Sequence, residues 1–190
     1  MAHLFDSLKL RDIVLPNRIG LPPMCQYSAH DGVAADWHFV HYGTRATGGA
    51  GLMIVEATAV TAEGRISPGD LGLWNDGQIE PLARIARFAG EHGTVAAVQL
   101  AHAGRKAGIS LGWQEQRSLR ADEGGWATVA PSALSFGPGY DVPQALDEAG
   151  IRAVIDQFAA AARRARDAGF PIVEIHAAHG YLLHQFLSPL

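Results

Sequence analysis

Two histidines and a tyrosine near the end of the chain form the pattern that is best suited to catalysis. His176 and His179 are three residues apart, and Tyr181 follows two residues later. A neutral imidazole presents one N–H, so the pair could bind an oxygen that becomes anionic in a transition state, and a tyrosine can supply a proton. The pair could equally be structural. A zinc site would need further ligands, and the sequence fixes none at ligand spacing.

Three earlier segments also end in residues that could take part in chemistry. Their apolar runs are followed by Cys25-Gln26-Tyr27, by Glu56-Ala57-Thr58 and by the polar stretch from Gln99 to Arg105. Taken alone, Cys25 is most often a small buried hydrophobic residue, and Gln99 is a buried amide at a strand end. Because it is the single cysteine, Cys25 also excludes a disulfide within the chain.

Parallel strands and helices must position these residues. Apolar runs predict a hairpin within 8–17 and then strands over 18–24, 52–60, 94–100 and 171–179. Cap and stop residues predict helices over 37–47, 78–92 and 147–169. Residues 101–146 form a long loop after the third strand, and loops of this length are usually functional. We expect residues 1–190 to form a single domain.

Continuous apolar strands that alternate with amphipathic helices are typical of a parallel sheet covered by helices. An open doubly wound sheet and a (β/α)8 TIM barrel both have this pattern. Every predicted strand ends in a polar or reactive cluster, as barrel active sites require, and no G-x-G-x-x-G follows the first strand. The sequence therefore predicts an α/β fold, the first half (strands 1–4) of a TIM barrel with an N-terminal hairpin.

The composition argues against several classes of protein. Hydrophobic residues make up 48% of the chain and charged residues 18%, with a formal net charge of −4. This balance gives no reason to expect nucleic acid or an anionic membrane as a partner. No apolar run approaches the length of a membrane span, and the N-terminus does not resemble a signal peptide, so we expect a cytoplasmic protein.

Four motifs, in order along the chain, resemble those of the Old Yellow Enzyme family of flavin-dependent ene-reductases. They are PPMCQYS (22–28), VEATAV (55–60), QLAHAGRKA (99–107) and EIHAAHGYLLHQFLSPL (174–190). Cysteine at position 25, together with Tyr27, resembles the bacterial, thermophilic-like subclass of NADPH dehydrogenases. The resemblance covers almost the whole chain and corresponds to the N-terminal half of the family's barrel.

The resemblance implies an FMN cofactor held noncovalently over the barrel mouth, with NADPH or NADH as the hydride donor. By motif match, the flavin contacts would be Pro22, Pro23, Met24, Cys25, Ala57 and Gln99. In this context Cys25 would tune the reduced flavin, Gln99 would hydrogen-bond its pyrimidine edge, and Tyr27 would reach the substrate. The nicotinamide phosphates could be attracted by His102, Arg105 and Lys106, although a solvated loop explains these residues equally well.

The implied reaction reduces the activated C=C bond of an α,β-unsaturated carbonyl or nitro compound. His176 and His179 would donate hydrogen bonds to the substrate oxygen, and Tyr181 would protonate the α-carbon. One alternative is a metal-dependent hydrolase built on the histidine pair. Another is a half-barrel without catalysis of its own, which needs its C-terminal half or a second copy of the chain as a partner.

Overall fold

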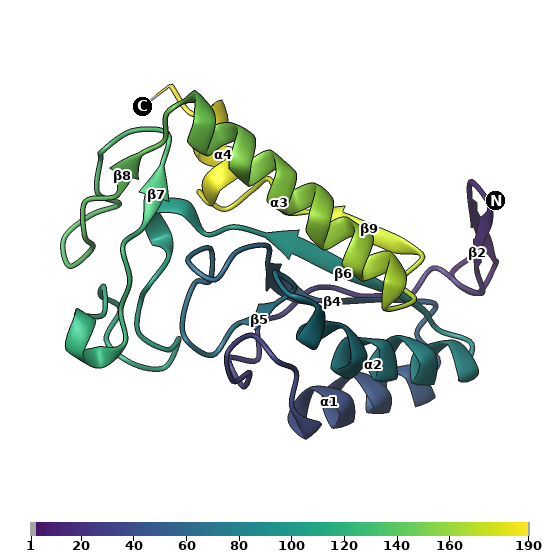
Figure 1. The fold of residues 1–190 in the computed structure, drawn as a ribbon. Coiled ribbons are helices and arrows are strands. Elements are labelled where there is room, and N and C mark those ends of the chain that lie inside the picture. Colours follow the sequence, from purple (N-terminus) through teal and green to yellow (C-terminus); the bar gives the residue numbers. More distant parts are fainter. Residues whose placement is uncertain (1–2, 190) are drawn as a thin grey trace.

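The computed structural model describes residues 3–189 and contains a parallel sheet with helices along it (Figure 1). Residues 1, 2 and 190 of the expected domain lie outside the described residues. The sheet is formed by β3 (Gly20–Leu21), β4 (Leu52–Ala59), β6 (Val95–Ala101) and β9 (Ile172–Ile175), and β4 also pairs with β5 (Leu71–Gly72). The connecting helices are α1 (Asp36–Thr47), α2 (Ile79–Glu91) and α3 (Glu148–Asp167).

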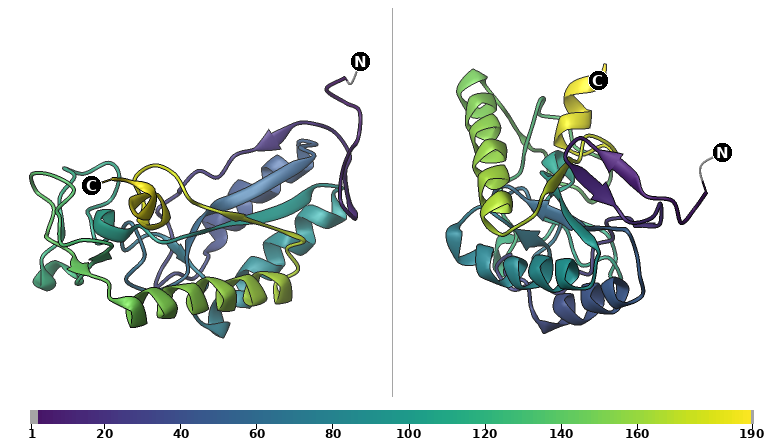
Figure 2. Two further views of the ribbon diagram at one scale, coloured as in Figure 1. Left: turned by 90° about the horizontal axis from the view of Figure 1, so that it is seen from above. Right: turned by 90° about the vertical axis from the view of Figure 1, so that its right-hand side faces the viewer.

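The order of the main strands in the sheet, β3-β4-β6-β9, follows their order along the chain, and all neighbours are parallel. Because parallel crossovers are right-handed, strands that are always added on the same side place their helices on the same face of the sheet. Figure 2 shows α1, α2 and α3 following one another around one side of the sheet. A doubly wound sheet has helices on both faces. The predicted first half of a (β/α)8 barrel is therefore confirmed.

Local signals explain where most elements begin and end. Asp147 Oδ1 accepts a hydrogen bond from the amide of Gly150 at 2.8 Å at the start of α3, and Gly169, with φ of +89°, follows its end. The three predicted helices agree with the observed bounds to within two residues. The first strand is shorter than the predicted 18–24, because the two prolines after Leu21 cannot donate to a ladder.

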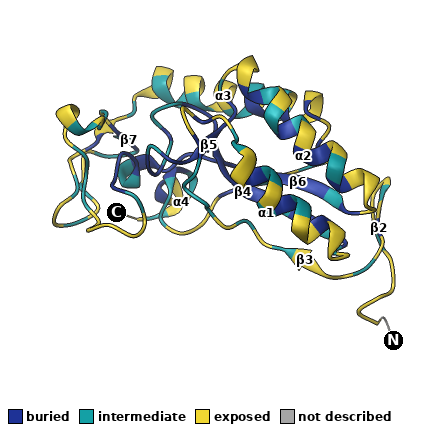
Figure 3. Cartoon of the chain, turned by 90° about the horizontal axis from the view of Figure 1, so that it is seen from below, coloured by how far each residue is buried: buried dark blue, intermediate teal, exposed yellow. Residues whose placement is uncertain are grey.

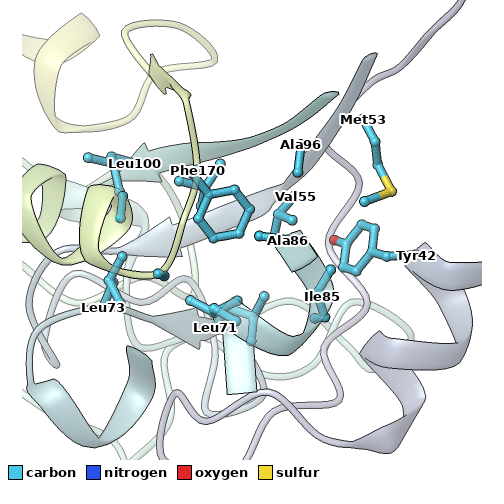
Figure 4. Close-up of a cluster of buried hydrophobic side chains, with 14 of the residues drawn as sticks. Tyr42, Met53, Val55, Leu71, Leu73, Ile85, Ala86, Ala96, Leu100 and Phe170 are labelled. Carbon is cyan, nitrogen blue, oxygen red and sulfur yellow. The ribbon is translucent and has the colours of Figure 1, made fainter. Parts of the chain in front are cut away.

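The main core lies between the sheet and its helices. Figure 4 shows Tyr42 of α1, Ile85 of α2 and Phe170 of the connection between α3 and β9 gathered in one cluster with strand residues such as Val55 and Leu100. Each of these side chains is at most 4% exposed. Burial of a large apolar side chain stabilises the fold by about 1.5–3 kcal/mol. The outward faces of the same helices are exposed (Figure 3), so the helices are amphipathic and cover only one side of the sheet.

The two ends of the sheet carry different structure (Figure 1). The predicted hairpin is present as β1 (Leu8–Leu10) and β2 (Ile13–Leu15), at the end where the strands begin. The carboxyl ends of the strands face α4 (Leu182–Leu187) and the region 101–146. This region contains short elements only: η2 (Gly104–Lys106), η3 (Ala121–Glu123), β7 (Val129–Ala130) and β8 (Gln144–Ala145). Within residues 3–189, no helix has both the length and the apolar character to cross a membrane.

Candidate active site

Residues from several strand ends meet at the carboxyl end of the sheet. Cys25 and Tyr27 follow β3, Gln99 lies near the end of β6, and His176 directly follows β9. Cys25 and Tyr181 both pack against one small apolar cluster, whose buried members are Ile66, Ala103, Ala107 and Ile109. The fold thus brings the first and fourth strand ends together.

The half-buried thiol of Cys25 keeps its proton. Burial raises its pKa most, and the nearby carboxyl groups of Asp70 and Glu56 raise it further. Hydrogen bonds with the amide of Ala57 and the side chain of Tyr27 oppose this rise only in part. A thiol with a raised pKa is a poor nucleophile and a weak S–H donor, which fits the non-nucleophilic role predicted for Cys25.

Tyr27 connects the Cys25 loop with an open space. Its backbone is left-handed, with φ of +50°, and its ring meets Trp113 edge to face at a centroid distance of 6.1 Å. A cavity of about 800 Å³ lies beside Tyr27 and is also lined by Pro68, Leu111 and Arg117. This volume is in the range that holds a small ligand. None of the other predicted site residues lines this cavity.

The amide of Gln99 is oriented by Glu174, its register partner on β9. Gln99 is 6% exposed, and its Nε2 donates to Glu174 Oε1 at 2.6 Å. An ionised carboxylate only accepts, so this bond turns Nε2 toward Glu174 and leaves Oε1 free to accept elsewhere. No donor within residues 3–189 bonds to Gln99 Oε1. The site therefore contains, on a largely buried side chain, an acceptor without a partner that suits an N–H of a ligand.

His176 and His179 lie together after β9, and they contact each other. His179 Nδ1 is 3.3 Å from His176 Nε2, with the rings edge to face. Burial lowers the pKa of His176, and its Nδ1 accepts from the amide of Ala178 at 3.3 Å, so the neutral ring carries its proton on Nε2. That proton points at His179. The pair presents both predicted donors only if a ligand oxygen replaces this contact.

Tyr181 stands beside the histidine pair as a protonated phenol. Its ring meets that of His176 edge to face at a centroid distance of 5.0 Å, and burial raises the pKa of its hydroxyl. Lys106 Nζ lies 4.9 Å from the Tyr181 ring centroid and donates to the carbonyl of His179 at 3.0 Å. A phenol that keeps its proton near two imidazoles is suited to act as a general acid.

The remaining predicted residues differ in how the structure places them. Pro22, Pro23 and Met24 form the approach to Cys25, and Met24 is 43% exposed. His102 was wrongly grouped with the phosphate-attracting residues, because it is 1% exposed and its Nδ1 accepts from the amide of Gly104 at 3.1 Å. A histidine this deeply buried cannot meet a phosphate that arrives from solvent.

Sequence reasoning assigned no role to a buried pair beneath the site, Glu56 and Tyr42. Glu56 is 0% exposed, and its Oε1 accepts from the Tyr42 hydroxyl at 2.9 Å. A charged residue inside the otherwise apolar strand run was the available signal. Its partner lies on α1, so a local pattern could not identify it.

Comparison with known proteins shows the family of the chain. The model of the NADH:flavin oxidoreductase / NADH oxidase family matches residues 3–190. An NADH:flavin oxidoreductase of Gibberella zeae is 51% identical over 100% of this chain, and an NADPH dehydrogenase of Listeria monocytogenes is 49% identical over 100% of it. The chain covers 47% and 52% of these two proteins, so it spans about half the length of the curated relatives it matches.

Solved structures of this group have the same fold over the shared part. A morphinone reductase in complex with tetrahydroNAD aligns with a TM-score of 0.84 at 31% identity, over 100% of this chain and 53% of its own. Old Yellow Enzyme from a Pichia species aligns with a TM-score of 0.84 at 30% identity, over 98% of this chain and 48% of its own. The chain therefore belongs to the NADH:flavin oxidoreductase / NADH oxidase family, whose cofactor is FMN, and it folds as the first half of an Old Yellow Enzyme barrel.

Proposed function

We propose that this chain forms the first half of an FMN-dependent ene-reductase. The enzyme reduces the activated C=C bond of an α,β-unsaturated carbonyl or nitro compound at the expense of NADPH or NADH. The observation that carries the proposal is the group formed by His176, His179 and Tyr181 beside Cys25. Imidazole donors for an oxygen and a phenolic proton for a carbon stand next to each other, as reduction of a polarised double bond requires.

The donor and acceptor set fits an FMN ring system. Gln99 Oε1 is an acceptor without a protein partner, suited to an N–H at the pyrimidine edge, and Cys25 offers a protonated thiol. The small side chain of Ala57, 6% exposed, allows a flat ring to approach β4. Further contacts would come from Pro22, Pro23 and Met24. When bound, FMN supplies the redox chemistry by taking hydride from the nicotinamide and passing it to the β-carbon of the substrate.

The side chains of the chain then orient and polarise the substrate. The substrate oxygen replaces the contact between His176 and His179 and accepts from a ring N–H of each. A donor of this kind typically lowers the barrier by about 3 kcal/mol. Tyr181 gives its phenolic proton to the α-carbon, and Tyr27 donates a hydrogen bond from the opposite loop.

A Tyr181→Phe variant tests this proposal. We would complete the barrel by co-expressing this chain with the C-terminal half of the Listeria NADPH dehydrogenase, and load it with FMN. Stopped-flow traces should show enone reduction slowed by roughly 10²-fold or more, with flavin reduction by NADPH unchanged. Tyr140→Phe, at a tyrosine that packs on the same apolar cluster, is the matched control and should change neither half-reaction. Equal losses in both half-reactions of Tyr181→Phe would exclude the proton-donor role.

A half-barrel that has no catalysis of its own is the second candidate, and the exposed side of β9 favours it. Val173 and Ile175 on this outer strand are 39% and 49% exposed. In this case the chain alone should bind no added FMN, whereas the completed barrel should bind it. The metal hydrolase has less support, because no three His, Cys, Asp or Glu side chains of the described chain are placed to hold one ion.

A further inference from the structure

We propose that Glu56 is the positioning residue for the loop that carries Cys25 and Tyr27, with its carboxylate holding that loop from beneath. The hold of Glu56 on the loop is a property of the folded chain. Its consequence for catalysis rests on the proposed function, in which Cys25 faces a flavin and Tyr27 faces a substrate.

The geometry at the carboxylate supports this assignment. Glu56 Oε2 accepts from the amide of Gln26 at 2.7 Å. The acceptor is a side-chain carboxyl of the neighbouring strand, so this bond ties the loop after β3 to β4.

The conformation of Tyr27 shows why such a tie is needed. Its φ of +50° is left-handed, a region that residues with a Cβ atom seldom adopt. A residue in this region stays there only when its surroundings hold it. Because the amide of Gln26, between Cys25 and Tyr27, bonds to Glu56, the carboxylate stabilises the conformation that aims the Tyr27 side chain and packs Cys25.

A bulge in β4 brings Glu56 to this position. Val55 pairs with Val98 and Thr58 with Leu100, so the two residues Glu56 and Ala57 oppose the single residue Gln99. Bulges of this kind re-aim side chains next to active sites.

The other side of the carboxylate is fixed by α1. The Tyr42 hydroxyl donates to Glu56 Oε1 at 2.9 Å and accepts from the amide of Glu56 at 2.9 Å. His38 Nδ1 accepts from the amide of Ala35 at 3.0 Å, so its neutral ring carries the proton on Nε2, 3.7 Å from Glu56 Oε1. A carboxylate held on one oxygen by α1 presents the other to the loop in a fixed direction.

The single cysteine makes the position of the loop measurable without any cofactor. The experiment follows alkylation of Cys25 by iodoacetamide in the 190-residue chain under native conditions, by mass spectrometry. Glu56→Ala should raise the rate by roughly 10-fold or more, because release of the loop exposes a thiol that is now half-buried. Glu56→Gln keeps the volume and one acceptor, so its rate should fall between those of the wild type and Glu56→Ala. If the alanine variant does not fold, the glutamine variant carries the test.

Thr94→Val is the matched control. It removes a buried hydrogen bond, from the Thr94 hydroxyl to the carbonyl of Ala50 at 2.7 Å, at the end of the sheet where the strands begin, and leaves the bond between Glu56 and the loop in place. Its alkylation rate should stay within about 2-fold of wild type even if its stability falls. An unchanged rate in the Glu56 variants, or equal acceleration in Thr94→Val, would overturn the assignment and leave Glu56 as a purely structural residue.

A second measurement separates this assignment from the proposed function. In the completed, FMN-loaded barrel, Glu56→Gln should lower kcat for enone reduction more than it raises KM, because the loop is misplaced but the histidine pair is intact. Accelerated alkylation in a barrel that reduces no enone would retain the assignment and reject the function. Normal alkylation in a barrel that does reduce enones would do the reverse.

Discussion

At the residue scale, the proposed function places the thiol of Cys25 against a bound flavin, so a change of this side chain should alter the flavin potential. Its S–H is a weak donor, and a hydrogen bond of this kind contributes about 0.5–1.5 kcal/mol. For a two-electron couple this corresponds to roughly 10–30 mV. We expect Cys25→Ala to lower the flavin midpoint potential by such an amount in the completed barrel, with FMN still bound. Redox titration against a reference dye measures it. An unchanged potential would show that the cysteine only fills space.

Glu56 should make the chain less stable as the pH rises through neutrality. Burial raises the pKa of its carboxyl from 4.5 to about 7, so the folded chain holds this proton more tightly than the unfolded chain does. The resulting stabilisation is complete below pH 4.5 and is lost as the pH rises through about 7. A shift of this size corresponds to at most about 3 kcal/mol.

Glu56→Gln isolates this contribution, because the variant has no proton to lose. The free energy of unfolding of wild type minus that of the variant should decrease between pH 4.5 and about 8. Urea denaturation at fixed protein concentration gives both values. Asp70, whose pKa burial raises to about 6, titrates in the same range, and its charge contributes to the raised pKa of Glu56, so the difference includes the interaction of the two carboxyl groups. A difference that does not vary with pH would contradict the prediction.

The identities of the candidate residues could be predicted from the sequence, whereas their contacts could not. Histidines three residues apart followed by a tyrosine form a local pattern. The bond between Gln99 and Glu174 joins residues 75 positions apart, and it depends on the β6–β9 register. His179, in the contact with His176, has a left-handed backbone with φ of +56°, a region that residues other than glycine seldom adopt and that the sequence around it does not signal.

At the scale of elements, Gln185 of α4 joins the loops that follow β6 and β9. Its Nε2 donates to the carbonyls of Gly180 at 2.7 Å and Ala103 at 3.3 Å, and its Oε1 accepts from the amide of Arg105 at 3.4 Å. The side chain is 4% exposed. These bonds hold the segment that carries Tyr181 against the end of the neighbouring strand.

We expect Gln185→Leu to lower the free energy of unfolding by roughly 2–3 kcal/mol, because it leaves buried backbone groups without partners. Gln157→Leu, at an exposed glutamine on α3, is the control and should change it by less than about 0.5 kcal/mol. Chemical denaturation at fixed protein concentration compares the two. Equal effects of both substitutions would mean that Gln185 does not hold the loops together.

Elements with strong local signals could be predicted, and those made by distant pairing could not. Asp147 and Gly169 mark the start and the end of α3 almost as expected, because a side-chain cap and a left-handed glycine act locally. The parallel pairing of β7 with β8 inside 101–146 had no such signal, because each strand is two residues long. Such short strands form only where the surrounding loop holds them together.

At the scale of the whole molecule, the outer strands β3 and β9 limit a sheet that does not close. Val173 and Ile175 of β9 are 39% and 49% exposed, although their register partners Val98 and Leu100 on β6 are 0% exposed. The helical layer therefore ends before it covers β9. Exposed apolar surface costs about 25 cal/mol per Å², and an unpaired strand edge is a template for another chain.

We therefore expect the 190-residue chain to associate with its C-terminal half or with a second copy of itself rather than to persist as a monomer. Light scattering at micromolar concentration tests this. Val173→Lys, which places a charge on the β9 edge, should shift the chain toward monomer. Val142→Lys, at a loop valine that is 66% exposed, should not.

Because the barrel is not closed, FMN binding by the chain alone should be weak. Barrels commonly hold a cofactor phosphate with the loops after strands seven and eight, and this half contributes only the loops of strands one to four. A pair of identical halves would repeat the first-half loops where the phosphate loops belong. The purified chain should therefore show little flavin absorbance, and the barrel completed with a C-terminal half should show more. A monomer that keeps stoichiometric FMN through gel filtration would contradict both expectations, and it would mean that residues of the first half hold the phosphate.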